Sequence, residues 1–304
     1  MKLIKPSFEI LEQLPGLEGM YKQIELAGRT CYKSEDKITE DSAKEFVDRM
    51  IKSGHGAMLE HGTVYLSLDM TSREQYFKYC YNKFSKANST GSAEYSTWRG
   101  FVTTNLRVLI ENDWMEDLQY ICEPTEYHEK RHTVKFVCDR GVSHEFVRHR
   151  VFSFAQESTR YCNYSKDKFG NEITCILPPW LSENDLPKGF GYTSDDWGSL
   201  ICEFYYEATE KGKSEGFTIE PVRNFVFALQ TSEQLYFSLL KEGWKAQEAR
   251  SVLPNALKTE LVMTGFESDW KHFFELRCPG SAHPQARELA IPLQEKFKEL
   301  KWVD

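Results

Sequence analysis

The sequence predicts an α+β fold in which a mixed or antiparallel sheet is flanked by helices, without a Rossmann domain. Residues 64–70 and 134–138 alternate between apolar and polar side chains, which is typical of strands with one buried face. Residues 40–53 and 286–300 carry apolar side chains three and four residues apart, which is typical of amphipathic helices. Neither a G-x-G-x-x-G sequence nor a P-loop occurs, so a dinucleotide bound here would not use a Rossmann turn.

The N-terminal half is expected to contain a capped helix and an insertion on either side of the strand at residues 64–70. In the helix at residues 40–53, Thr39 is the expected N-cap and Gly54 the expected end. Residues 71–130 are polar and aromatic. We expect them to form a mostly helical insertion, with a loop at KANSTGSAE, residues 86–94.

The second half is expected to combine helices, a long loop and a strand. The strand at residues 134–138 leads into a helix that carries Arg148, and a polar loop is expected at residues 163–195. Ser232 is the expected cap of a further helix. The remaining expectations are a helix at residues 196–217, a strand around Leu261 and Met263, a helix at residues 270–276, and a last helix at residues 286–300 with a kink at Pro292. With no repeat, low-complexity tract or linker, the 304 residues are expected to form one domain.

The chain is acidic, with a formal net charge of −8 and a pI of about 5.6. Because non-specific nucleic-acid binding rests on neutralising phosphates, we expect no nucleic-acid partner. No apolar run approaches the roughly eighteen residues that a membrane helix needs, and no signal peptide is apparent, so we expect no membrane partner. The eight cysteines include no C-x-x-C pair. Free thiols in the reducing cytoplasm are therefore the expected state.

One segment combines several anion-binding groups within an apolar stretch. It is RHRVFSFAQESTRY, at residues 148–161, and its polar members are Arg148, His149, Arg150, Gln156, Ser158 and Arg160. Arginine binds phosphate with two parallel hydrogen bonds, and the apolar neighbours argue against a solvated run of charges. We therefore expect the segment to hold an anion beside an apolar, ring-shaped partner.

Two parts of this segment allow more than one interpretation. If residues 148–150 are helical, their side chains point about 100° apart and contact different ligands or a neighbouring subunit. The alternative is a basic helix surface with ion pairs to Glu145 or Glu157. Ser158 and Arg160 would share one face of an extended segment and form a phosphate cradle with the backbone N–H groups between them. The alternative is an N-cap serine beside a surface arginine, while a nucleophilic Ser158 lacks an oriented base in the sequence.

The spacing R-H-R, seven residues, S makes this segment resemble the signature of the flavin-dependent thymidylate synthases. Three more stretches resemble that family in the same order. They are RTCY at residues 29–32, GHGAMLEH at residues 54–61, and the run from ARSVLP at residues 249–254 to Leu276 and Arg277. The resemblance implies an enzyme, a methyltransferase that converts dUMP to dTMP with 5,10-methylenetetrahydrofolate, FAD and NADPH. It also implies a homotetramer with shared active sites.

The resemblance also implies roles for individual residues. Arg277 is the implied catalytic residue, which polarises the uracil ring by electrostatics because arginine stays charged. The implied cofactor-binding residues are His55, Ala57, Glu60, Arg148, His149, Arg150, Gln156 and His272. The implied substrate-binding residues are Glu145, Arg148, Gln156, Glu157, Ser158, Thr159, Arg160, Arg250 and Arg277. No metal is expected, because His55, Glu60 and His61 lack the H-E-x-x-H spacing and a third ligand.

Several positions depart from the family pattern. Ala57 stands where a threonine or serine is frequent, and Phe266 and Ser268 stand where some members carry asparagine and arginine. Those side chains help to hold FAD in other members, so looser FAD binding is expected here. Glu145 is acidic where some members carry glutamine. The unrelated classical thymidylate synthases use a cysteine nucleophile in a Pro-Cys-His context, and this chain has no Pro-Cys dipeptide, which favours a flavin as the carrier of the redox step.

Two other functions stay open from the sequence. A related flavoenzyme would modify dUMP differently, for instance by hydroxymethylation. A non-catalytic RNA- or nucleotide-binding protein would use the basic segment without any chemistry. The mass of the product separates the first from a synthase, and a bound yellow chromophore argues against the second.

Overall fold

Residues 1–94, 96–181 and 221–304 are described by the computed structural model, and their Cα positions separate the chain into two units. Unit 1 comprises Met1–Pro6, Asp139–Gly141 and Thr159–Lys258, and unit 2 comprises Ser7–Cys138, Val142–Ser158 and Thr259–Asp304. Each unit has its own core. That the whole chain forms one domain stays a prediction.

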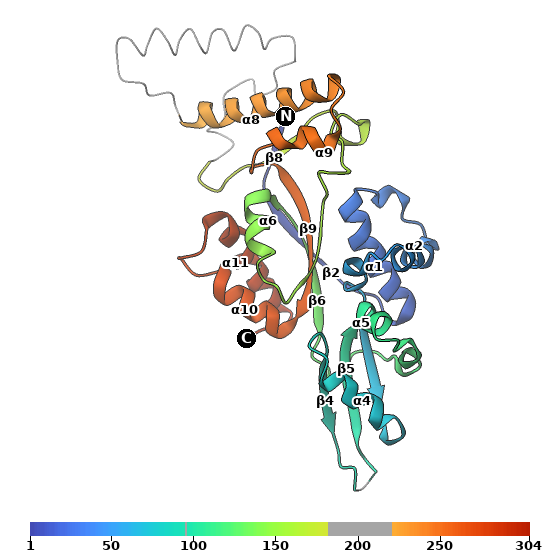
Figure 1. The fold of residues 1–304 in the computed structure, drawn as a ribbon. Coiled ribbons are helices and arrows are strands. Elements are labelled where there is room, and N and C mark those ends of the chain that lie inside the picture. The colour runs from blue at the N-terminus through green and yellow to red at the C-terminus, as the bar shows by residue number, and fades with distance from the viewer. Residues whose placement is uncertain (95, 182–220) are drawn as a thin grey trace, which may run out of the picture. The chain divides into compact units, whose positions relative to one another are not determined.

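The main sheet of unit 2 has four strands in the order β2-β6-β9-β7 (Figure 1). These strands are β2 (Ser7–Leu11), β6 (Arg131–Asp139), β7 (Ser153–Gln156) and β9 (Lys258–Phe266). β2 pairs antiparallel with β6, and β7 pairs antiparallel with β9. The predicted alternation is confirmed in β6, where Val134, Phe136 and Cys138 are buried.

Helices cover both faces of this sheet. They are α1 (Gly16–Tyr32), α10 (Glu267–Arg277) and α11 (Pro284–Glu299). Leu261 and Met263 of β9 pack in one cluster with residues of α10 and α11, whereas Val262, which points to the opposite face, packs with Ala27 of α1. Figure 1 shows α10 and α11 on one side of the sheet and α1 on the other. Burial on both faces explains why β9 is buried along almost its whole length, including the polar side chains of Thr259 and Thr264.

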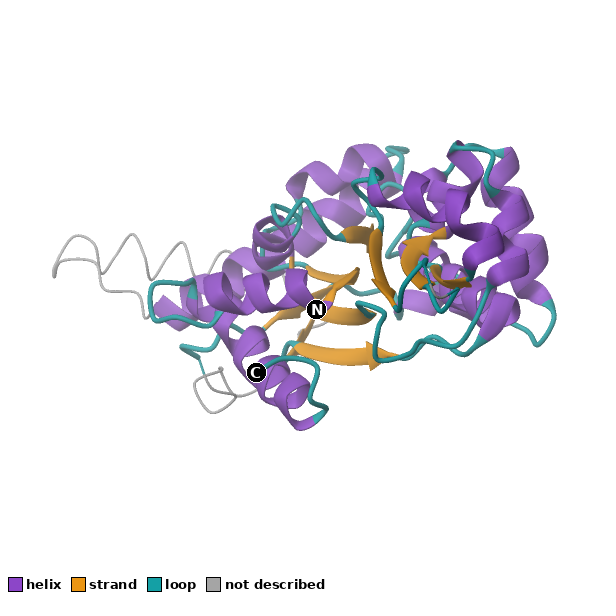
Figure 2. Cartoon of the chain, turned by 90° about the horizontal axis from the view of Figure 1, so that it is seen from below, coloured by secondary structure: helices purple, strands orange, loops and turns teal. Residues whose placement is uncertain are grey.

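Unit 2 also contains a three-stranded sheet in the order β3-β5-β4. Its strands are β3 (Thr63–Leu68), β4 (Lys86–Thr90) and β5 (Arg99–Asn105), and both outer strands pair antiparallel with β5. Other helices of unit 2, with η marking 3-10 helices, are η1 (Glu35–Lys37), α2 (Ser42–Lys52), α3 (Gly56–Leu59), η2 (Met70–Ser72), α4 (Arg73–Cys80), α5 (Leu106–Glu111) and η3 (Met115–Tyr120). Figure 2 draws the strands in orange and the helices in purple. Val64, Leu66 and Leu68 are fully buried, as the predicted alternation requires.

The described residues of unit 1 include a parallel pair of strands and the long helix α8. Its elements are β1 (Lys2–Ile4), η4 (Asp167–Phe169), β8 (Thr174–Ile176), α8 (Pro221–Lys241), α9 (Ala246–Ala249) and η6 (Arg250–Val252). Its core includes Tyr164, Cys175, Leu229 and Tyr236. The helix α6 (Arg140–Phe146) follows β6, and its first two residues belong to this unit.

The predicted helix at residues 40–53 is confirmed as α2, but its first residue differs from the prediction. Asp41 is the N-cap, and the Thr39 N–H donates a hydrogen bond of 2.9 Å to Ser42 Oγ, so Thr39 is not the cap. Ser53 is the C-cap, and Gly54 follows it with a φ of +69°. Glycine adopts this left-handed conformation without the steric cost of a Cβ atom.

Two further helix boundaries differ from the predictions. Ser232 lies inside α8, so the predicted cap is wrong, because the helix already begins at Pro221. The helix after β6 ends at Phe146, so Arg148 lies beyond it rather than on it. The elements predicted at the C-terminus are confirmed as β9, α10 and α11, and α11 continues through Pro292.

The insertion at residues 71–130 contains helices and, in addition, two strands. Residues 86–90 form β4, so the loop predicted at residues 86–94 is wrong in its first half. Their polar side chains show no apolar alternation, and hydrogen bonding to β5 determines the strand instead. Of the loop predicted at residues 163–195, the part up to residue 181 contains η4 and β8. The rest of that loop and the helix predicted at residues 196–217 lie outside the described residues.

Two general expectations concern thiols and membranes. In the described part of the chain, Cys31, Cys80, Cys122, Cys175 and Cys278 are free thiols. Within the same part of the chain, no helix combines the length and the apolar composition needed to cross a bilayer.

Candidate functional site

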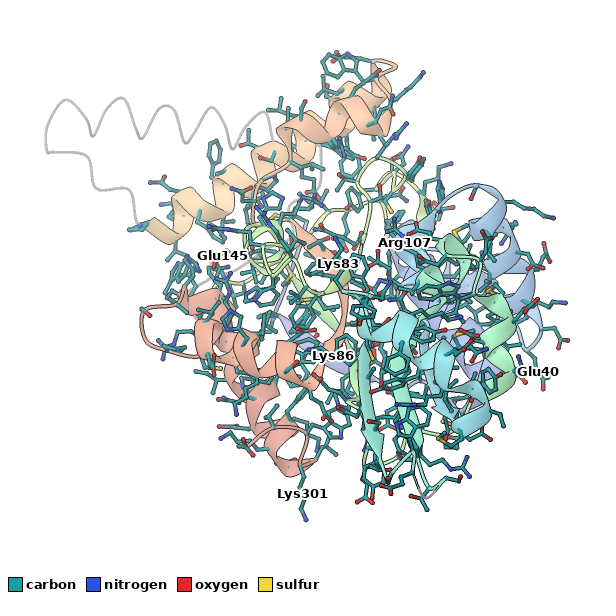
Figure 3. The ribbon with its side chains drawn as sticks, turned by 60° about the horizontal axis from the view of Figure 1, so that its bottom comes forward. Glu40, Lys83, Lys86, Arg107, Glu145 and Lys301 are labelled. Carbon is teal, nitrogen blue, oxygen red and sulfur yellow. The ribbon has the colours of Figure 1, made fainter. Side chains whose placement is uncertain are left out.

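In unit 2, Arg277 at the end of α10 contacts two residues of the segment around α6. Its Nε donates to His149 Nε2 at 2.9 Å, and its Nη2 donates to the Glu145 carbonyl oxygen at 2.7 Å. Its Nη1 also forms an ion pair with the Glu145 carboxylate, which Figure 3 labels. The Arg277 side chain is only 14% exposed. Three hydrogen-bond donors of Arg277 therefore fix the orientation of its guanidinium group. The positive charge of this group lies beside the carboxylate of Glu145.

His149 is neutral in this arrangement. Burial, then the positive charge of Arg277 and then that of His272, lower the pKa of His149 from 6.5 to about 4. Since Nε2 accepts a hydrogen bond from Arg277, the ring proton of the neutral imidazole lies on Nδ1. His272 is exposed, with its ring centroid 6.5 Å from that of His149.

The three residues of the R-H-R triplet point in different directions. Two successive turns, from the His149 N–H to the Phe146 carbonyl and from the Phe152 N–H to the His149 carbonyl, follow the end of α6. His149 is buried, whereas Arg148 and Arg150 are exposed. In the described structure, the Glu145 carboxylate forms its ion pair with Arg277. The predicted alternative, in which Arg148 or Arg150 pairs with Glu145, is therefore not observed.

The residues at the end of β7 form both side-chain and backbone hydrogen bonds. Gln156 Nε2 donates to Ser143 Oγ at 2.8 Å. The N–H of buried Glu157 donates to the Glu260 carbonyl at 2.8 Å, and the Ser158 N–H donates to the Cys31 carbonyl at 3.0 Å. The last contact brings together the RTCY stretch and the segment at residues 148–161, which the sequence order alone does not reveal.

In unit 1, two arginines lie close to the turn that begins at Thr159. The strand β7 ends at Gln156 and residues 159 and 160 form a turn, so the predicted extended geometry from Ser158 to Arg160 is wrong. Arg250 Nη1 instead donates to Thr159 Oγ1 at 3.2 Å, and Arg160 Nε donates to Gln247 Oε1 at 3.4 Å. Both arginines are exposed. Two guanidinium groups and a hydroxyl are a donor set that suits a phosphate.

Gln247 and Arg107 contact predicted site residues without having been predicted themselves. Gln247 lies two residues before the ARSVLP stretch, and this adjacency was its only signal in the sequence. Arg107, labelled in Figure 3, donates through Nη1 to Glu60 Oε1 at 2.6 Å and through Nε to Glu111 at 2.7 Å. No pattern in the sequence connects Arg107 with Glu60.

The GHGAMLEH stretch divides into an exposed and a buried part. His55 and Ala57 are exposed, with the Tyr32 hydroxyl 3.4 Å from His55 Nδ1. His61 is fully buried, and its Nδ1 lies 2.8 Å from Thr264 Oγ1. Burial, and then the charge of Arg131, lower the pKa of His61 to about 3, so this imidazole is also neutral. In the described part of the chain, no three His, Cys, Asp or Glu side chains form a group that could hold a metal ion.

Phe266 and Ser268, which depart from the family pattern, both contact other residues of the chain. The Phe266 ring is 8% exposed and lies beneath Lys86 at 5.6 Å and Arg131 at 5.5 Å. Ser268 Oγ hydrogen-bonds to Glu129. The Phe266 ring is therefore largely buried within the protein, and the Ser268 hydroxyl already has Glu129 as a hydrogen-bond partner.

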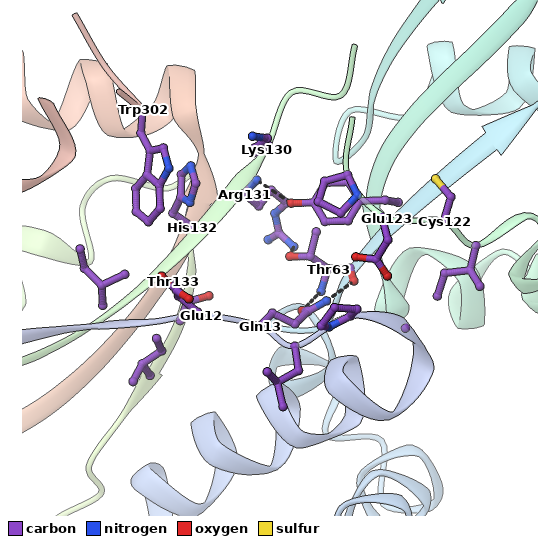
Figure 4. A pocket seen from close by; sticks show the side chains of 18 residues that line it. Glu12, Gln13, Thr63, Cys122, Glu123, Lys130, Arg131, His132, Thr133 and Trp302 are labelled. Atoms are coloured by element: carbon purple, nitrogen blue, oxygen red, sulfur yellow. Dashed lines mark hydrogen bonds between the residues drawn. The ribbon is translucent and has the colours of Figure 1, made fainter. Parts of the chain in front are cut away.

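A pocket of about 260 Å³ opens elsewhere in unit 2 (Figure 4). It lies beside Glu12, Glu123 and Lys130, and the stacked rings of His132 and Trp302, with centroids 3.6 Å apart, form one wall. None of the predicted site residues lines it. This pocket is therefore separate from the residues that surround Arg277.

Comparisons with known proteins identify the family. The family described as thymidylate synthase complementing protein matches residues 74–301. A flavin-dependent thymidylate synthase of Corynebacterium aurimucosum is 24% identical over 278 residues, which cover 91% of this chain and 75% of that protein. One of Geobacter sulfurreducens is 30% identical over 159 residues, 52% of each chain, so the match spans about half the length of this relative.

Among solved structures, the UMP/dUMP methylase PolB from Streptomyces cacaoi bound with 5-Br dUMP aligns with a TM-score of 0.41 and 16% identity. The alignment covers 99% of this chain and 93% of that chain. The family match, which extends over most of the sequence, confirms the resemblance predicted from the four motifs. The chain belongs to the thymidylate synthase complementing protein family.

Proposed function

We propose that this protein is a flavin-dependent thymidylate synthase that converts dUMP to dTMP with 5,10-methylenetetrahydrofolate, FAD and NADPH. One observation carries the proposal. Arg277, from the C-terminal stretch of the family pattern, is held by Glu145 and by His149 of the R-H-R triplet. Two motifs separated by 128 positions thus build one cationic centre from residues with implied roles at substrate and flavin.

Arg277 is proposed to activate the uracil ring. A fixed cation near a ring carbonyl stabilises the negative charge that grows as carbon 5 becomes nucleophilic. Arginine does not donate a proton at neutral pH, so its contribution is electrostatic. Neutral His149 supports this role because it accepts a hydrogen bond from Arg277 without adding a second cation.

The phosphate of dUMP is proposed to bind to Thr159, Arg160 and Arg250. Their hydroxyl and guanidinium groups offer several donors in a small region of unit 1, and the exposure of both arginines leaves them accessible. Gln156, Glu157 and Ser158, from the end of β7, are proposed to contact the nucleotide as well. In this scheme Ser158 is a hydrogen-bonding residue rather than a nucleophile.

The residues expected to hold FAD fit an anionic cofactor with a flat ring. Arg148 and Arg150 are exposed and have no acidic partner in the described part of the chain, so their donors are available to phosphate or flavin oxygens. His55 and Ala57 are exposed and are proposed to contact FAD as well. Glu60, another proposed FAD contact, accepts a hydrogen bond from Arg107. When bound, FAD would supply the reducing equivalents, with NADPH restoring its reduced form. A homotetramer with shared active sites and a cytoplasmic location complete the proposal.

The activity is tested by the visible spectrum and the product of the purified protein. We expect a flavin absorption band that changes when dUMP is added. With methylenetetrahydrofolate and NADPH present, mass spectrometry should detect dTMP, and reactions lacking dUMP or folate serve as controls. A hydroxymethylated nucleotide would replace the proposal with a different modification of dUMP. Absence of flavin, before and after reconstitution with FAD, would indicate a non-catalytic nucleotide-binding protein.

A further inference from the structure

Lys33 adopts an unusual backbone conformation directly after the RTCY stretch. It is the C-cap of α1, with φ of 48° and ψ of 55°, in the left-handed region. A side chain with a Cβ atom is strained there, and glycine is the residue that normally fills this position. A lysine in a position suited to glycine suggests that its side chain is needed.

The Lys33 ammonium group joins two acidic residues. Its Nζ donates to Glu35 Oε1 at 2.8 Å and to Glu260 Oε1 at 2.9 Å. The side chains of Lys33 and Glu260 are 19% and 12% exposed, so this ion pair is largely shielded from water. Burial acts to lower the pKa of Lys33, but the hydrogen bonds and charges of Glu35 and Glu260 outweigh it and the pKa is raised. Lys33 is therefore charged at any pH at which an enzyme works.

Both partners of this ion pair lie next to groups that hold the end of β7. The Glu260 carbonyl accepts the hydrogen bond of the Glu157 N–H at 2.8 Å, one residue beyond the end of that strand. The Cys31 carbonyl, two residues before Lys33, accepts the hydrogen bond of the Ser158 N–H at 3.0 Å. The backbone of Glu157 is thus hydrogen-bonded to β9, and the backbone of Ser158 is hydrogen-bonded to the end of α1. The Lys33–Glu260 ion pair joins the end of α1 to β9.

We propose that Lys33 is a positioning residue that holds Glu157 and Ser158 in the geometry that binds dUMP, by fixing the end of α1 to β9 through Glu260. This inference rests on the proposed function, in which both residues contact the nucleotide. Lys33 itself need not contact dUMP. Its effect passes through two backbone carbonyl groups, so it should alter affinity for the nucleotide more than the rate of the chemical steps.

Lys33→Met tests the proposal, with Lys22→Met as a matched control. Lys22 lies on the same helix and forms an exposed ion pair with Glu18 at 2.5 Å, so the control also removes one charge and one ion pair from α1. We expect Lys33→Met to raise the KM for dUMP about 10-fold, with kcat and the KM for NADPH changed less than about twofold. Lys22→Met should leave all three unchanged. Lys33→Arg keeps the charge and should restore most of the affinity for dUMP.

A second variant covers the case in which Lys33→Met does not fold. Glu260→Gln removes the charged partner but keeps the backbone carbonyl that accepts from Glu157, and it should raise the KM for dUMP in the same way. Equal KM values for Lys33→Met and Lys22→Met would overturn the proposal. So would a parallel loss of dUMP affinity, NADPH affinity and melting temperature, since that pattern indicates a purely structural role.

The two hypotheses fail in different ways. If the wild-type protein forms no dTMP, the proposed activity is wrong, and equilibrium dialysis with dUMP then compares Lys33→Met with Lys22→Met directly. If the wild-type protein forms dTMP and the two variants behave alike, the activity stands and the role of Lys33 is wrong. A wild-type protein that neither forms dTMP nor binds dUMP contradicts both.

Discussion

At the scale of single residues, the orientation of Arg277 is determined by Glu145 and His149. Replacing Arg277 by alanine should lower dTMP formation by about 10²–10³-fold, the usual effect of removing a preorganised electrostatic group. Arg277→Lys should recover little of this loss, because an ammonium group cannot reproduce the planar fork that contacts both residues. Oxidation of NADPH does not need an activated uracil and should be less affected.

Both rates should be measured in each Arg277 variant after its FAD content has been confirmed. Equal loss of NADPH oxidation and dTMP formation would mean that Arg277 organises the flavin instead. Unchanged dTMP formation would remove it from the active site.

The neutral state of His149 makes stability depend on pH. Its pKa is about 4 in the folded protein and 6.5 in its ordinary state, so the unfolded chain binds more protons between these two values. Stability from this residue is complete above pH 6.5 and is lost as the pH falls towards 4. The loss should reach about 3 kcal/mol.

Urea unfolding of the wild-type protein and of His149→Gln, measured from pH 7.5 to 4, isolates this contribution, because His61 is present in both proteins. The variant should lose less stability as the pH falls. Identical slopes would show that His149 does not titrate with a lowered pKa.

The sequence was sufficient to propose site residues but did not predict how they are arranged, and their roles stay predictions. The R-H-R triplet and Arg277 were recognisable because their types and spacing match a family pattern. Their contact was not, since no local rule places side chains 128 positions apart next to each other. Likewise Ser158 and Arg160 were expected to share one face of an extended segment, but residues 159 and 160 form a turn after β7, in which Thr159 accepts a hydrogen bond from Arg250.

At the scale of elements, the close approach of α1 to α2 depends on Gly28. A Cβ atom at this position would lie 2.5 Å from Cζ of Phe46, whose ring is 3% exposed and has Arg29 stacked on it at 4.9 Å. The ring has little room to move, so Gly28→Ala should destabilise the protein by about 1–3 kcal/mol despite the better helix propensity of alanine.

Gly280→Ala is the matched control, because a Cβ atom there meets nothing within 4 Å. The control should change the free energy of unfolding by less than about 1 kcal/mol. Both values follow from denaturant unfolding at neutral pH. A Gly28→Ala protein as stable as the control would show that the two helices can separate without cost.

The accuracy of the element predictions followed the strength of the hydrophobic pattern. In β3 and β6 the buried positions alternate, and in α2 they recur at helical spacing, so these elements were predictable. The strand β4 carries Lys86, Asn88 and Thr90, and its partner β5 rather than its own composition makes it a strand. The cap predicted at Ser232 failed because a serine inside a long helix looks, in sequence, like one at its start.

At the scale of the whole molecule, the family resemblance leads us to expect a homotetramer. Light scattering on the FAD-loaded protein should give a mass close to four times the 35.5 kDa of one chain. Because FAD in such an assembly lies between subunits, removal of the flavin should weaken the tetramer and re-addition should restore it. A mass of 35.5 kDa that does not change with FAD would contradict shared active sites.

The position of β4 at the edge of the β3-β5-β4 sheet has a consequence for the solubility of the protein. An edge strand presents unpaired backbone groups that can recruit a strand from another molecule and start aggregation. Lys86 and the amide of Asn88, which donates to the Tyr127 carbonyl at 2.9 Å, interrupt that edge with a charge and a local contact. A more apolar, strand-forming sequence in β4 would therefore make aggregation easier, and the charge of Lys86 counteracts it.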